Sequence, residues 1–122
     1  MNSNMGRSED DIIQQAMAII LNSGDARNFA SQAMDAIVEE DFAKAEALLK
    51  EADEVQKEAH RIQTEMIQGD IRGGDEKMGY SLLFAHAQDT LMSIQVEINM
   101  TKNFLKYAKK HAEKSSAGKQ IK

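Results

Sequence analysis

The stretch LLFAHAQDTLM, residues 82–92, places an imidazole and a carboxylate inside an otherwise apolar run. His86 and Asp89 are three residues apart, so on a helix they lie one turn apart on nearly the same face. A carboxylate on a surface that is to be covered costs free energy unless it is paired, hydrogen-bonded or bound to a metal. This segment therefore predicts a reactive histidine, a metal site or a polar layer in an oligomer.

The composition around this segment favours an all-α fold. The 122 residues include no proline, and β-branched residues are sparse, which favours helix over strand. Aromatic residues make up 5% of the chain and tryptophan is absent, so the core must be built from aliphatic side chains. The length is sufficient for one domain and no more.

The composition also excludes several classes of function. Without cysteine, the chain has no disulfide framework, thiolate nucleophile or zinc–thiolate site. A formal net charge of −5 argues against general nucleic-acid binding. No apolar run approaches the roughly 20 residues of a membrane span, and the polar N-terminus lacks the apolar region of a signal peptide. We therefore predict a soluble, cytoplasmic protein.

Apolar residues that recur every three or four positions predict three helices. The first begins near Glu9 and is interpreted as one long helix with a bend or a close packing contact at Gly24; two shorter helices are the alternative. The second follows Asp41, a candidate N-cap, and ends at Gly69. The third runs from about Tyr80 to about His111.

The segments outside these helices are expected to be irregular. Residues 1–8 are predicted to be a disordered leader and residues 112–122 a disordered tail, which leaves 9–111 as a single three-helix domain. The connection 69–79, GDIRGGDEKMG, is predicted to be a flexible loop that borders the site. It is not interpreted as a nucleotide-binding loop, because the required Gly-Lys-Ser/Thr sequence and a preceding strand are both missing.

The third predicted helix carries two apolar stripes on opposite sides when about 100° of rotation is allowed per residue. One stripe consists of Leu83, Ala87, Leu91, Ile94, Ile98 and Leu105. The other consists of Leu82, Ala85, Met92, Val96 and Met100, with Asp89 in its middle and His86 at its edge. Because a three-helix domain needs only one buried stripe, the second stripe predicts contact with another subunit.

Three functions of His86 fit its surroundings. The imidazole could act as a nucleophile, with one ring nitrogen attacking while the other is held by a hydrogen bond. His86 and Asp89 could share a metal, but two ligands are too few for a structural zinc site unless a partner chain contributes others. Asp89 could instead be a polar specificity residue in an interface. His60 and His111 are interpreted as having no functional role.

HAQDTLM, residues 86–92, resembles the active-site helix of the lactose/cellobiose-type enzyme IIA proteins of the bacterial phosphoenolpyruvate-dependent sugar phosphotransferase system. Three further segments resemble the family in the same order and at similar spacing: IILNSGDAR at 19–27, EEDFAKAEALLKEA at 39–52 and EAHRIQTEMIQGD at 58–70. The resemblance covers roughly residues 12 to 107. It implies an antiparallel three-helix protomer that associates as a homotrimeric nine-helix bundle.

The resemblance also implies a function and a site. His86 would accept a phosphoryl group from the phosphocarrier protein HPr and pass it to a cysteine of the IIB component, which phosphorylates the sugar at the membrane component IIC. Asp89 would lie near the three-fold axis, where three copies hold a structural divalent metal, often Mg²⁺. Many relatives carry a second histidine where this chain has Thr90. We expect Thr90, Ser93 and Gln63 to support the phosphoryl group.

Two points stay open at the level of sequence. The transported sugar is predicted to be a β-glucoside such as cellobiose or chitobiose, with lactose as the alternative. The competing interpretation of the whole chain is a non-catalytic trimeric helical adaptor, in which His86 and Asp89 form only a polar layer of the interface.

Overall fold

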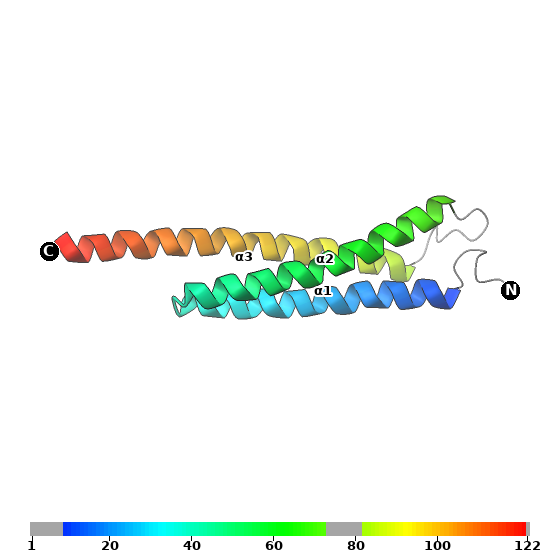
Figure 1. Ribbon diagram of the computed structural model, residues 1–122, viewed down its shortest axis with the longest axis horizontal. Coiled ribbons are helices and arrows are strands. Elements are labelled where there is room, and N and C mark those ends of the chain that lie inside the picture. The colour runs from blue at the N-terminus through cyan, green and yellow to red at the C-terminus, as the bar shows by residue number, and fades with distance from the viewer. Residues whose placement is uncertain (1–8, 73–81, 122) are drawn as a thin grey trace.

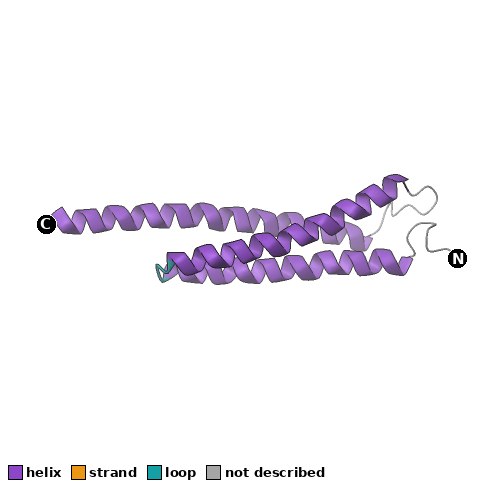
Figure 2. Cartoon of the chain, in the orientation of Figure 1, coloured by secondary structure: helices purple, strands orange, loops and turns teal. Residues whose placement is uncertain are grey.

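The computed structural model describes residues 9–72 and 82–121, and every element in them is an α-helix. α1 spans Glu9–Val38, α2 spans Phe42–Arg72 and α3 spans Leu82–Ile121. α1 and α2 form an antiparallel hairpin, and α3 lies alongside it and extends beyond the α1–α2 turn (Figures 1 and 2). The prediction of an all-α, antiparallel three-helix protomer is confirmed. No helix in the described part of the chain is long and apolar enough to span a membrane.

α1 passes through Asn22, Ser23 and Gly24 without a break, so the alternative of two shorter helices is wrong. The expected packing contact at Gly24 is also wrong, because a Cβ atom built there would meet nothing within 4 Å. Ser23, by contrast, is fully buried in the core. The segment 22–24 therefore stays helical, because its buried residue, Ser23, is small enough to fit between the packed helices.

The α1–α2 turn is held by backbone hydrogen bonds and one side-chain cap. The Glu40 N–H donates to the Ile37 carbonyl at 2.9 Å, and the Asp41 N–H donates to the Ala36 carbonyl at 2.9 Å. This pattern terminates a helix through a residue in the left-handed conformation, here Glu40 with φ of 60°. The Asp41 carboxylate then accepts from the Lys44 N–H at 3.3 Å, which confirms Asp41 as the N-cap of α2.

The ends of the helices differ from the predicted ones. α2 continues past Gly69 to Arg72, and α3 begins at Leu82. α3 also continues past His111 to Ile121, so the predicted disordered tail at 112–122 is helical through Ile121. That segment contains Ala, Glu, Lys and Gln, which are strong helix formers, and it prolongs a helix already anchored in the bundle. The predicted leader at 1–8 and most of the predicted loop at 69–79 lie outside the described residues.

The core divides into two apolar clusters separated by a polar layer. The cluster nearest the α1–α2 turn includes Ala30, Ala33, Leu49, Ala52, Ile94 and Ile98. The other, near the start of α3, includes Ala16, Ile19, Ala59, Ile62, Met66, Phe84, Ala87 and Leu91. Between them, Gln56 of α2 is buried and its Nε2 donates to the Leu91 carbonyl of α3 at 2.8 Å. Ser23 occupies the same layer from α1.

The two stripes of α3 meet different surroundings. Ala87, Leu91, Ile94, Ile98 and Leu105 of the first stripe are buried, as predicted. The residues of the second stripe are exposed in the single chain; Leu82, for example, retains 86% of its accessible surface and Met92 retains 62%. We call the exposed stripe of Leu82, Ala85, Asp89, Met92, Val96 and Met100 the α3 apolar face.

Candidate functional site

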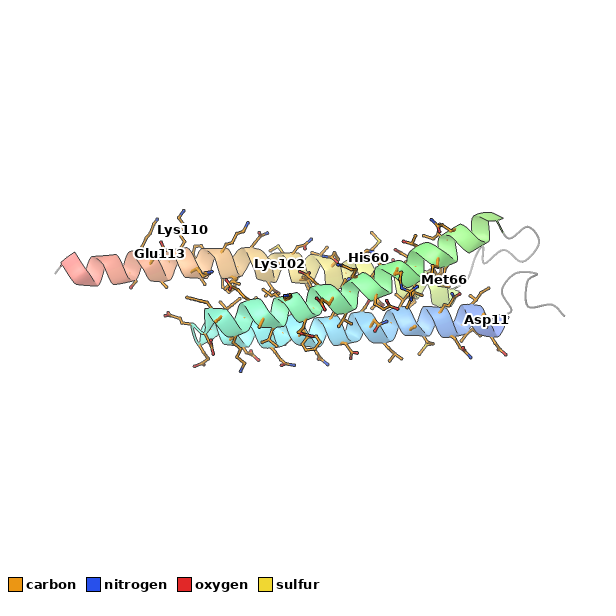
Figure 3. The ribbon with its side chains drawn as sticks, in the orientation of Figure 1. Asp11, His60, Met66, Lys102, Lys110 and Glu113 are labelled. Carbon is orange, nitrogen blue, oxygen red and sulfur yellow. The ribbon has the colours of Figure 1, made fainter. Side chains whose placement is uncertain are left out.

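His86 lies in the second turn of α3, and its side chain is exposed. Phe84 and Ala87 beside it are buried against α1 and α2, so they fix the rotation of the helix and point His86 outward. The two remaining histidines, His60 on α2 (Figure 3) and His111 on α3, are also exposed. Exposure alone does not distinguish His86; its place at the edge of the α3 apolar face does.

Thr90 contacts the backbone of the candidate nucleophile rather than its ring. The Thr90 hydroxyl donates to the His86 carbonyl oxygen at 2.8 Å. This intrahelical bond uses the hydroxyl proton, so Thr90 does not serve as a donor to a group on the imidazole in this geometry. Ser93 is exposed and follows His86 by two helical turns, which places both residues on the same side of α3.

α2 carries Gln63, the third residue expected to support the phosphoryl group. α2 contacts α3 through the hydrogen bond from Gln56 to the Leu91 carbonyl. A second contact is the ion pair of Asp53 with Lys102, which is labelled in Figure 3, at 2.7 Å. Leu91 lies about 140° round the helix from His86 and Lys102 about 160°. α2 therefore contacts α3 on the side roughly opposite His86, while Gln63 is partly buried on α2 and its support of the phosphoryl group stays a prediction.

α1 borders the side of α3 that carries His86. Arg27 of α1 donates to both carboxylate oxygens of Glu97, from Nε at 3.1 Å and from Nη2 at 2.8 Å. The hydrogen bond and the charge of Glu97 raise the pKa of Arg27, which stays protonated. Glu97 follows His86 by eleven residues, close to three full turns, so the ion pair marks the α1 edge of the same surface.

An exposed apolar patch on α1 was not predicted. Ile13 and Met17 recur at helical spacing along α1, and 43% and 40% of their surface is exposed; Leu21 is exposed as well. Ile12, Ala16 and Ile19 of the same helix segment pack in the cluster that contains Phe84 and Ala87. The patch therefore lies level with His86 along the bundle. We call Ile13, Met17 and Leu21 the α1 patch.

Asp89 is exposed in the middle of the α3 apolar face. Within residues 9–72 and 82–121 of one chain, no three His, Cys, Asp or Glu side chains are close enough to hold a metal ion. His86 and Asp89 therefore do not complete a metal site by themselves. A carboxylate oxygen is a suitable ligand for Mg²⁺, which takes near-octahedral oxygen ligands and retains water. One Asp89 per chain fits such an ion only if several copies bring it to one point.

The chain is similar to known proteins in both sequence and structure. Residues 14–109 match the family described as PTS system, lactose/cellobiose specific IIA subunit. The chain is 39% identical over 84 residues to the N,N'-diacetylchitobiose-specific EIIA component of Escherichia coli K12, covering 69% of this chain and 71% of that protein.

Two solved structures are also similar. The cellobiose-specific enzyme IIA of Bacillus anthracis has a TM-score of 0.78 and 37% identity, covering 92% of this chain and 99% of that chain. The IIA(chitobiose) chain in its solution complex with HPr, from Escherichia coli, has a TM-score of 0.74 and 33% identity, covering 83% of this chain and 96% of that one.

Proposed function

This chain belongs to the lactose/cellobiose-specific IIA family of the phosphotransferase system, and from that membership we propose that His86 is the residue that carries the phosphoryl group. As a family member, the chain is a phosphotransferase component. The observation that supports His86 is its exposed imidazole on a helix that is held rigidly by buried neighbours on its other side. A protein donor can reach such a ring, and the helix keeps it in place.

We propose HPr as the donor, because a related IIA protein was solved in complex with HPr. In the transfer, the lone pair of one imidazole nitrogen of His86 attacks phosphorus. A new P–N bond forms while the bond between phosphorus and the donor breaks, and that electron pair leaves with the donor. Positioning and neutralisation of the phosphoryl oxygens are the main catalytic requirements of such a step. We propose Ser93, on the same side of α3, as a candidate hydroxyl for this task.

The second transfer reverses the role of the imidazole. In our proposal a cysteine thiolate of the IIB component attacks phosphorus, and the P–N bond breaks with its electron pair returning to His86. The sugar is then phosphorylated on the membrane component IIC, so this chain acts in the cytoplasm and never contacts the sugar. Relatives of similar identity are named for chitobiose and for cellobiose, and we propose a β-glucoside of this kind, with lactose as the alternative.

The α3 apolar face supports assembly into a homotrimer. Soluble monomers rarely leave a continuous apolar stripe of this length uncovered. A groove between α1 and α3, lined in part by Ala30, Met34, Val96 and Met100, widens the apolar surface on one side. Three copies that place this face at a common axis would form a nine-helix bundle and leave His86 at its rim. Light scattering at micromolar concentration tests this arrangement, and a monomer would contradict it.

The proposed trimer would bring three copies of Asp89 to one axis. Their carboxylates would repel one another, and a structural divalent ion such as Mg²⁺ would cancel that repulsion. Asp89→Leu should therefore leave a stable trimer without metal, because leucine suits a face that is otherwise apolar. Dissociation of this variant would show that Asp89 does more than hold an ion. The phosphoryl transfer itself is assigned to His86 and uses no group supplied by the metal.

The decisive experiment measures intact mass after incubation with phosphoenolpyruvate, enzyme I and HPr. We expect one acid-labile phosphoryl group per chain, lost in His86→Ala and retained in His60→Ala and His111→Ala, all with unchanged helical content. Phosphorylation of the His86→Ala variant would refute the assignment. Absence of phosphorylation in the unaltered chain would instead favour the non-catalytic trimeric adaptor, in which His86 and Asp89 serve only the interface.

A further inference from the structure

We propose that the α3 basic tip, formed by Lys106, Tyr107, Lys110, His111 and Lys114, holds the chain against an anionic membrane surface. All five side chains are exposed, and together they line one hollow of the molecular surface. The attachment is peripheral, because no helix in the described part of the chain could span a membrane. The proposal goes beyond phosphoryl transfer and does not depend on the role of His86.

Charge is unevenly distributed along the chain. The formal net charge of the whole chain is −5, yet the segment 102–122 contains seven lysines and a single acidic residue, Glu113. The rest of the chain is therefore more acidic than the whole. A negatively charged surface attracts one end of such a molecule and repels the other, so it binds the chain in one orientation.

The lysines of the tip differ from two neighbouring lysines of α3. Lys102 and Lys109 each form an ion pair with a carboxylate of α2. The three tip lysines form no ion pair with any carboxylate of residues 9–72 and 82–121. Figure 3 shows one of them, Lys110, on the part of α3 beyond the α1–α2 turn. The charge of the tip is therefore available to an external partner.

Aromatic rings lie beside these charges. The rings of Tyr107 and His111 stack with their centroids 5.8 Å apart, and Phe104 stacks on Tyr107 at 6.2 Å. The tip lysines follow one another at four-residue intervals, so they form one row along the neighbouring side of the helix. Tyrosine is enriched at the membrane–water interface, where lysine extends its charge toward the headgroups.

The chemistry of the tip favours a continuous negative layer over a partner of fixed shape. The segment 102–122 contains lysine but no arginine. Lysine is a flexible point charge, whereas arginine offers the rigid fork that recognises individual carboxylates and phosphates. A second copy of this chain is a poorer occupant, because a symmetric contact would bring equivalent lysines together. Anionic lipid headgroups provide negative charge without requiring a fixed geometry.

Attachment through the tip leaves the proposed phosphoryl site accessible. Figure 1 shows α3 extending past the α1–α2 turn at the end of the molecule opposite to the start of α3. Lys110 follows His86 by twenty-four residues, which corresponds to about 36 Å along the helix. The end of the bundle that carries His86 therefore faces away from the lipid, where a protein partner can reach it.

The test is sedimentation of the full chain with lipid vesicles of two compositions. One contains phosphatidylcholine alone, and the other contains phosphatidylcholine and phosphatidylglycerol in equal parts. The tip variant replaces the three tip lysines by glutamine, Lys106→Gln/Lys110→Gln/Lys114→Gln. Glutamine keeps the helix propensity of lysine and removes its charge.

The matched control is Lys44→Gln/Lys50→Gln/Lys57→Gln, which removes three exposed lysines of α2. Both variants lose the same number of positive charges and therefore have the same net charge. Any difference between them in vesicle binding reports where the lysines lie and not how many there are.

We expect the unaltered chain to sediment with the phosphatidylglycerol vesicles and not with phosphatidylcholine alone, and its binding should weaken as salt is raised. Each lysine near an anionic membrane strengthens binding by about fivefold, so the tip variant should bind about 100-fold more weakly. The control variant should bind like the unaltered chain.

Three results would each overturn the proposal: equal binding to the two vesicle compositions, no binding to either, and equal weakening in the two variants. If the unaltered chain ignores both kinds of vesicle but is retained on immobilised polyglutamate through the tip lysines, the partner is an acidic protein and membrane attachment is wrong.

Discussion

The buried amide of Gln56 offers the sharpest test of how the three helices are held together. Only 2% of Gln56 is exposed, and its Nε2 donates to the Leu91 carbonyl at 2.8 Å. Its Oε1 is buried and has no hydrogen-bond partner among the described residues. The Nε2 group therefore stabilises the α2–α3 contact. The Oε1 atom loses its hydrogen bonds to water on folding and gains none in return.

These two ends predict opposite effects for two substitutions. In Gln56→Leu the lost hydrogen bond costs about 1 kcal/mol, and removing an unpaired buried acceptor returns about 1–3 kcal/mol. Leucine also fills most of the vacated space, so we expect this variant to be more stable by about 1 kcal/mol. Gln56→Ala leaves a cavity between the two apolar clusters, and we expect it to lose about 2–4 kcal/mol.

The assay is urea unfolding followed by helical circular dichroism, with all variants at the same chain concentration because assembly would contribute to the measured stability. The slope of the transition should stay unchanged, so that the midpoints report stability alone. If Gln56→Leu is destabilised as strongly as Gln56→Ala, then Oε1 is satisfied in solution and the polar layer is a complete network. That result would refute the assignment of an unpaired acceptor.

Three further predictions concern the helices and their charges. Gly24→Ala should stabilise the chain by about 1 kcal/mol in the same urea assay, because Gly24 is exposed within α1 and its new Cβ meets nothing within 4 Å. Glu40→Gly should also stabilise by about 1 kcal/mol, because its φ of 60° is strained for a residue with a Cβ atom; a loss of stability would contradict this. The hydrogen bond from Arg61 lowers the pKa of Glu58 in the folded chain. The contribution of this ion pair to folding stability is therefore fully present above the pKa that Glu58 has in the unfolded chain, and it is lost as pH falls through the lower pKa of the folded chain. NMR titration should show the pKa of Glu58 rising toward its ordinary value in Arg61→Ala, and an unchanged titration would exclude the contact in solution.

Sequence periodicity was sufficient for the fold because every helix carries its own pattern. The buried stripe of α3 and the Asp41 cap both follow from local rules that need no knowledge of the partner helices. Ser23 could not be assigned in this way. In sequence it belongs to a polar cluster with a glycine, which is the usual composition of a break, and only the packing of α2 against α1 makes a small buried residue suitable there.

The surroundings of His86 were less predictable than His86 itself. Ile13 and Met17 recur at helical spacing along α1 and yet are exposed, because the width of a buried stripe depends on how closely the neighbouring helices approach. Gln63 was expected to support the phosphoryl group on His86, and this stays a prediction. Only the structure shows that α2 covers the opposite side of α3. Such relations depend on the rotation of one helix against another, which a single sequence does not encode locally.

The rotation of α3 also explains how one helix can serve three purposes. Leu91 and Ile98 face the core, Asp89 and Val96 lie on the exposed apolar face, and His86 lies between that face and α1. Each successive residue turns the helix by about 100°, so a one-residue slip would carry His86 either into the apolar face or against α1. The hydrogen bond from the Gln56 side chain of α2 to the Leu91 carbonyl of α3 opposes such a slip, because it joins the two helices. The buried polar layer lowers the stability of the core. It also fixes the rotation of α3 about its axis, and this rotation decides whether His86 is accessible.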